Sequence, residues 1–93
     1  MSKTKTIKVN SKAMEPAIKV GATVAYDEVP FASLNVNDVI VFKEPYNQIV
    51  SLGRIVQIGP KGLATKGDNN AGNYPYIVTP KMYVGKTTSI SNP

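Results

Sequence analysis

The chain has 93 residues, of which 42% are hydrophobic and 18% are charged, and its formal net charge is +5. This length suits a single domain, and the composition is typical of a folded protein rather than a disordered one. The chain contains neither cysteine nor histidine. Disulfides, thiolate or imidazole metal sites, and general-base catalysis by histidine are therefore excluded. We expect no metal and no cofactor.

The sequence has no membrane-spanning segment, since no run approaches the roughly 18 apolar residues that a transmembrane helix needs. The N-terminus is charged and lacks the apolar core of a secretory signal. We therefore expect a soluble protein that is cytoplasmic or associated with a particle. An extracytoplasmic location is expected only if an upstream anchor has been removed.

Lysines crowd the start of the chain, at Lys3, Lys5, Lys8 and Lys12. We interpret residues 1–5 as a basic N-terminal arm. No aromatic residues interleave with these lysines to form a stacking platform, so nucleic-acid binding is not favoured.

Short β-branched runs bounded by Gly, Pro, Asn and Asp predict an all-β fold. Strands are expected at residues 4–9, 23–26, 38–42, 48–58, 63–66, 76–78 and 82–86. Residues 39–42 read Val-Ile-Val-Phe, a pattern typical of a strand that is buried on both faces. A turn or short helical turn is expected at residues 13–20, and a frayed polar tail at residues 88–93. Six to seven short strands in one domain, residues 1–93, favour a small coiled sheet or partly open barrel.

Five segments together resemble the motifs of the signal-peptidase and LexA-like serine peptidases, in that family's order. They are Ala-Met-Glu-Pro at 13–16, Asn-Asp-Val-Ile-Val-Phe at 37–42, Gly-Arg-Ile-Val at 53–56, Thr-Lys-Gly-Asp-Asn-Asn at 65–70 and Val-Gly-Lys at 84–86. The first and fourth segments are similar to Ser-Met-Glu-Pro and Thr-Lys-Gly-Asp-Asn-Asn in the archaeal and endoplasmic-reticulum branch. The resemblance implies the catalytic-domain fold of this family.

The chain departs from the family at the positions that carry catalysis. The resemblance implies a serine nucleophile at position 13 and a lysine or histidine base at position 53, where this chain has Ala13 and Gly53. A methyl group cannot attack a carbonyl. Of the expected polar set only Asp68 remains, because residues 71–74 contain no carboxylate. Ala13, Gly53 and Asp68 are therefore vestigial positions, and we predict a pseudo-peptidase without enzymatic activity.

Two readings would restore a peptidase. In the first, the natural residue at position 13 is a nucleophilic serine, which engineering has replaced with alanine. In the other, Ser11 or Ser51 acts with Lys12 or Lys43 as the base, which requires the lysine to be buried with a lowered pKa. Ordinary strand-edge serines and solvated lysines are the simpler interpretation.

The surviving motif residues also have structural interpretations. Asp68 is expected to cap backbone N–H groups of its own turn, while Met14 and Pro16 are expected to pack and to turn the loop. Gly53 removes a side chain, which would widen the former active-site groove.

Active relatives hold their substrate as an extended strand at a sheet edge, a docking mode that can outlast the catalytic residues. We therefore predict a protein-binding or assembly module, with a protein partner bound by β-strand pairing. The predicted groove consists of Ser11, Met14, Glu15, Pro16, Ser51, Gly53 and Asp68. The alternative is a structural or decoration component of a phage or other particle that forms a homo-oligomer or lattice.

Overall fold

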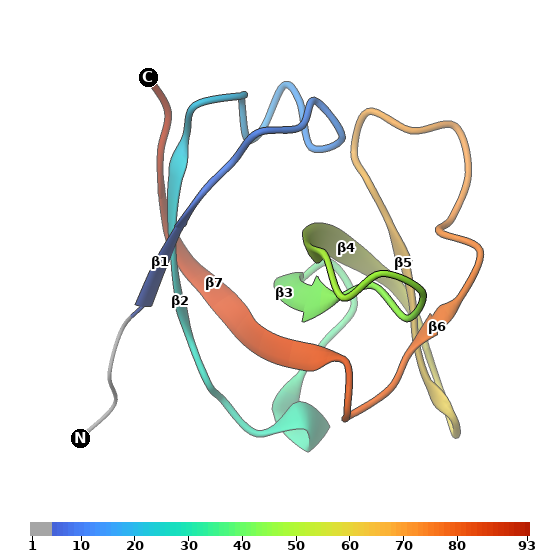
Figure 1. The fold of residues 1–93 in the computed structure, drawn as a ribbon. Helices are drawn as coiled ribbons and strands as arrows, with labels where there is room; N and C mark the ends of the chain where they lie inside the picture. Colours follow the sequence, from blue (N-terminus) through green and yellow to red (C-terminus); the bar gives the residue numbers. More distant parts are fainter. Residues whose placement is uncertain (1–4) are drawn as a thin grey trace.

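The computed structural model describes residues 5–93, and over these residues the fold is all-β, as predicted (Figure 1). The strands are β1 (Lys5–Lys8), β2 (Thr23–Asp27), β3 (Val39–Lys43), β4 (Val50–Gly59), β5 (Gly62–Lys66), β6 (Ile77–Val78) and β7 (Tyr83–Ser91). One short 3-10 helix, η1 (Phe31–Ser33), precedes β3. All seven strands belong to one open antiparallel sheet with the order β1-β2-β7-β3-β4-β5-β6.

Strand β3 lies at the centre of the sheet and is buried on both faces, as its apolar run predicted. Successive side chains of a strand point to opposite faces. Val39 and Val41 accordingly pack into one core cluster, with Met14, Ile18, Val24 and Leu52. Ile40 and Phe42 pack into a second cluster, with Leu34, Ile55, Leu63 and Val78. A strongly curved sheet that wraps around its central strand can cover both faces in this way (Figure 1).

Residues 88–91 belong to a strand, so the expectation of a frayed polar tail at residues 88–93 was wrong for these four residues. Strand β7 continues to Ser91 and pairs with β2, with Ser91 opposite Thr23 and Ile90 opposite Val24. Residues 87–91 read Thr-Thr-Ser-Ile-Ser, and their three β-branched side chains favour a strand. Beyond the strand, Asn92 accepts from Lys19 N–H at 2.9 Å and donates to the carbonyl of Ala17.

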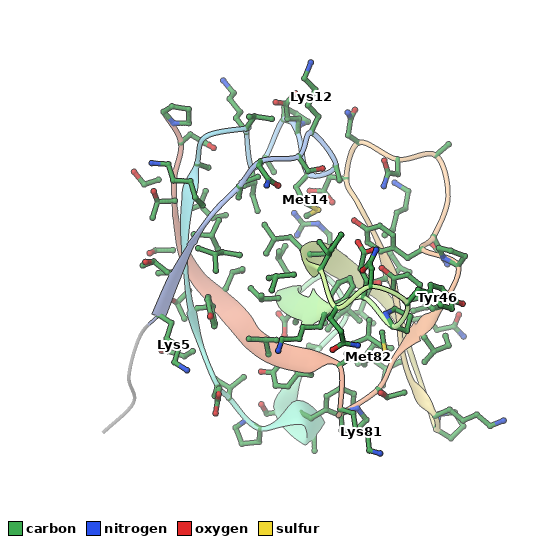
Figure 2. All side chains as sticks on the ribbon, viewed as in Figure 1. Lys5, Lys12, Met14, Tyr46, Lys81 and Met82 are labelled. Carbon is green, nitrogen blue, oxygen red and sulfur yellow. The ribbon has the colours of Figure 1, made fainter. Side chains whose placement is uncertain are left out.

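Residues 13–20 form a series of turns, as expected. Within it Ile18 N–H donates to the carbonyl oxygen of Met14 at 2.9 Å. The side chains of Met14 and Ile18 are almost fully buried. These two anchors, together with Asn92, fix the loop against the sheet, and Figure 2 shows Met14 pointing into the body of the protein.

The proposed basic arm, residues 1–5, lies outside the described residues except for Lys5, which begins β1. Among residues 5–93 there is no helix with the length and apolar character that a membrane crossing requires.

Candidate functional site

A pocket of about 170 Å³ lies between the segment that follows β1 and the beginning of β4. Its walls come from residues 9–11, 13 and 14, from Glu44 and Ile49 in the β3–β4 connection, from residues 50–52 of β4, and from Tyr74 in the loop that precedes β6. The segments that meet here come from strands on opposite sides of β3 in the sheet order, and the curvature of the sheet brings the two sides toward each other (Figure 1).

The structure brings together part of the predicted groove. Ser11, Met14 and Ser51 line the pocket, as does Ala13, which the sequence analysis interpreted as a vestigial position. The other four predicted groove residues, Glu15, Pro16, Gly53 and Asp68, are not part of its lining.

Ala13 nevertheless contacts the turn that carries Asp68. The backbone N–H of Asn69 donates to the carbonyl oxygen of Ala13 at 2.8 Å, and Asp68 N–H lies 3.5 Å from the Sδ atom of Met14. A Cβ atom at Gly67 would lie 2.7 Å from the carbonyl of Ala13, so only glycine allows this approach. Two motifs that are more than fifty residues apart in the sequence therefore form one contact.

Asp68 does not cap its own turn. Its carboxylate accepts two hydrogen bonds from Arg54, from Nε and Nη2, each at 2.8 Å. The hydrogen bond from Arg54, opposed by partial desolvation and aided by the charge of Arg54, lowers the pKa of Asp68. The Asp68 carboxylate binds the guanidinium of Arg54 rather than backbone N–H groups of its own turn, because paired, charge-assisted hydrogen bonds are stronger than single bonds to a neutral amide. Arg54 also donates to the carbonyl of Asn37, so it ties three segments together.

Gly53 does not widen the pocket, and that expectation was wrong. The residue is buried, and a Cβ atom there would lie 3.1 Å from side-chain atoms of Phe42, Thr65 and Tyr74. The Tyr74 ring packs edge-on against Phe42 and stacks on Tyr76. Aromatic side chains therefore fill the space that the absent side chain leaves.

The serine hydroxyls have other partners than lysine. Ser11 Oγ accepts a hydrogen bond from Ala13 N–H at 3.1 Å, and Ser51 Oγ donates to Glu44 at 2.5 Å. Lys12 and Lys43 are exposed, and Figure 2 shows Lys12 pointing away from the body of the protein. The burial that a relocated serine–lysine pair would need is thus missing at both lysines.

One edge of β4 has no partner strand beside the pocket, although the carbonyl of Leu52 accepts a hydrogen bond from the Tyr74 hydroxyl at 3.0 Å there. Strand β5 pairs with β4 only from Arg54 onward, whereas β3 pairs with it from Val50. Lys43, which faces Val50, donates its N–H to Met82 on the opposite side. In an antiparallel ladder, residues alternate between pointing toward and away from the partner strand. The backbone groups of Val50 and Leu52 therefore point away from β3, toward the pocket.

The opposite wall of the pocket carries a similar backbone group. Val9 donates to Ala22 and accepts from Gly21, so it points toward β2. Asn10, the next residue, lines the pocket, and a continuation of the same alternation would turn its N–H and C=O toward the cavity. Backbone of the β4 edge and of the segment after β1 thus lies on either side of one cavity.

Sequence reasoning missed seven of the eleven residues that line the pocket, which are Val9, Asn10, Glu44, Ile49, Val50, Leu52 and Tyr74. Glu44 and Tyr74 are the two of these that carry an ionisable side chain. Tyr74 reaches the site because its N–H donates to the carbonyl of Thr65 and its hydroxyl donates to that of Leu52. No periodicity in the sequence signals such a fold-back, since it depends on a ten-residue irregular loop.

Among residues 5–93 there is no cluster of three or more acidic side chains that would hold a metal ion. A comparison with models of known protein families and a search of curated proteins found no match to this chain.

Proposed function

We propose that the chain is a catalytically inactive relative of the signal peptidases that binds an extended peptide segment of a protein partner in this pocket. The resemblance in the five motifs supports the ancestry. Alanine at position 13 and glycine at position 53 support the loss of catalysis, because removing a catalytic pair leaves no activated nucleophile.

The observation that carries the binding role is the free edge of β4. The outward N–H groups of Val50 and Leu52 are two residues apart, which is the repeat at which an added antiparallel strand forms its hydrogen bonds. The carbonyl of Leu52 already accepts from the Tyr74 hydroxyl, so the groups open to an added strand are the N–H and C=O of Val50 and the N–H of Leu52. Asn10 supports a second set of bonds from the opposite wall. A peptide that entered between the two segments would extend the sheet without any rearrangement of β3 or β7.

Apolar side chains at the rim support the same role. Ile49 is 56% exposed and Val50 is 45% exposed, and both line the pocket. Burying such side chains under a ligand stabilises the complex by about 25 cal/mol per Å² of apolar surface.

A random displayed-peptide library, selected on the immobilised chain, tests this function. We expect selected peptides to lose binding to Ile49→Arg, which obstructs the pocket. The matched control is Val36→Arg, since Val36 is an aliphatic residue of similar exposure (47%) that does not line the pocket. Equal binding to both variants, or failure to select any peptide, would count against the proposal.

A structural component of a particle is the second candidate function. The surface at the β6 edge of the sheet favours it. A hollow of about 300 Å³ is lined by the β4–β5 hairpin, Ala64 and Ile77, and Ile77 is 46% exposed. This surface lies at the β6 edge of the sheet, away from the pocket. Analytical ultracentrifugation distinguishes the two roles, because assembly through this face predicts concentration-dependent association that Ile77→Lys abolishes.

A further inference from the structure

The pocket contains one carboxylate, that of Glu44, and its immediate partners are neutral. Ser51 Oγ donates to one carboxylate oxygen, and Asn47 Nδ2 donates to the other at 3.2 Å. The ion pairs among residues 5–93 are Arg54–Asp68 and Lys86–Asp38, so neither involves Glu44. Although the chain has a net charge of +5, no cationic side chain within residues 5–93 forms an ion pair with this carboxylate.

The carboxylate also keeps hydrogen-bonding capacity. An ionised carboxyl group offers about four lone-pair sites, of which Ser51 and Asn47 occupy two. The field of Glu44 extends to the neighbouring rings, because its charge adds to desolvation in raising the pKa of Tyr74 and of Tyr76.

The rest of the lining is suited to a long aliphatic chain. Met14, Leu52 and Ile49 supply apolar walls, and Tyr74 supplies an aromatic ring. A lysine side chain places methylene groups against apolar surface while its ammonium group seeks a charged or polar partner. Cations are attracted to aromatic faces as well as to carboxylates.

We propose that this pocket takes the lysine side chain of the bound peptide, with the methylenes against the apolar walls and the ammonium group at Glu44. This inference rests on the proposed function, and it adds the identity of the side chain that the peptide must carry. Charge complementarity favours lysine, because a neutral or acidic side chain would leave the Glu44 carboxylate without a cationic partner beneath the ligand.

Peptide pools provide the main test. In each pool of short random peptides, the central residue is fixed as lysine or as norleucine, which has the same chain without the ammonium group. We expect the lysine pool to bind about tenfold more tightly, the factor that corresponds to about 1.4 kcal/mol. Glu44→Gln should remove this preference. Glu28→Gln, which makes the same charge change at an exposed residue outside the pocket, should retain it.

A second measurement separates the two proposals. Titration with n-butylammonium, followed by backbone NMR shifts, should perturb Leu52 and Tyr74, whereas n-pentanol should perturb them less. Pools that bind equally with lysine and norleucine would overturn the lysine inference and leave strand binding intact. If no pool binds but butylammonium still shifts these amides, strand binding fails and the cation pocket stands. If neither probe binds, both proposals are overturned.

Discussion

Arg54 and Asp68 form a bidentate ion pair in which both nitrogen–oxygen distances are 2.8 Å. Arg54 lies in β4 directly after Gly53, and Asp68 lies directly before Asn69, whose N–H donates to the carbonyl of Ala13. The ion pair therefore links the two segments that contain positions 53 and 13. In the serine peptidases whose motifs the chain resembles, the corresponding neighbourhoods hold the base and the nucleophile. Here the pair holds positions 13 and 53 in one framework, although their residues, alanine and glycine, can act neither as a nucleophile nor as a base.

Asp68→Asn should destabilise the fold by about 1 kcal/mol at neutral pH, because the pair is bidentate but partly exposed. The pKa of Asp68 is lowered in the folded state, so its stabilisation is present above the unfolded pKa of about 3.9 and is lost as pH falls further. Urea unfolding at neutral pH and at about pH 3 measures both effects. A difference between the proteins that is as large in acid as at neutral pH would contradict this account.

Gly53→Ala should cost about 1–3 kcal/mol, because the added Cβ would lie 3.1 Å from Phe42, Thr65 and Tyr74 in a packed region. Gly72→Ala is the matched control, since a Cβ there meets nothing within 4 Å, and its effect should be close to zero. Thermal unfolding of both variants gives the comparison. Equal stability would mean that the space at Gly53 is open after all.

Glu44→Gln should lower the pKa of Tyr74 and Tyr76 toward the ordinary value of about 10, because the negative charge disfavours tyrosinate. Burial remains the larger cause of both shifts, so the pKa of Tyr76, about 12 in the native chain, should fall only partly. Ultraviolet titration of the phenols, with Glu28→Gln as control, measures the shift. Because these pKa values are raised by folding, stability should decline as pH rises from 10 to about 12.

Deleting residues 88–93 should destabilise the fold by several kcal/mol, since it removes the part of β7 that pairs with the first residues of β2 and the two hydrogen bonds of Asn92. Asn92→Ala alone should cost about 1 kcal/mol. Denaturant unfolding distinguishes these outcomes. A truncated chain as stable as the full one would show that the segment is dispensable.

The sequence was sufficient for the fold class because strand periodicity is local information. The buried run at Val39–Phe42 is the clearest case, since its four apolar residues divide between the two core clusters. The C-terminal strand was underestimated because Thr87–Ser91 is polar, and its pairing with β2 depends on a partner more than sixty residues away.

The candidate site was only partly predictable, for a related reason. The sequence located Ser11, Ala13, Met14 and Ser51 at the pocket, because Ala13 and Met14 belong to the first motif and each serine lies two residues before a motif position, 13 or 53. Asp68 was assigned to turn capping, since its pairing with Arg54 is a tertiary contact. Tyr74 depends on the path of an irregular loop, and Glu44 depends on which side of a turn faces the cavity.

The most direct test of strand binding removes one backbone donor at the free edge of β4. Val50→Pro eliminates the outward N–H of Val50, and this position at the start of the strand tolerates proline without loss of a ladder bond. Val50→Ala shortens the side chain but keeps the N–H. The affinity of a library-selected peptide for both variants, measured by isothermal titration calorimetry, is the decisive quantity. The account predicts about tenfold weaker binding to Val50→Pro than to Val50→Ala. Equal affinity, in variants that are both shown to be folded, would contradict binding by strand addition.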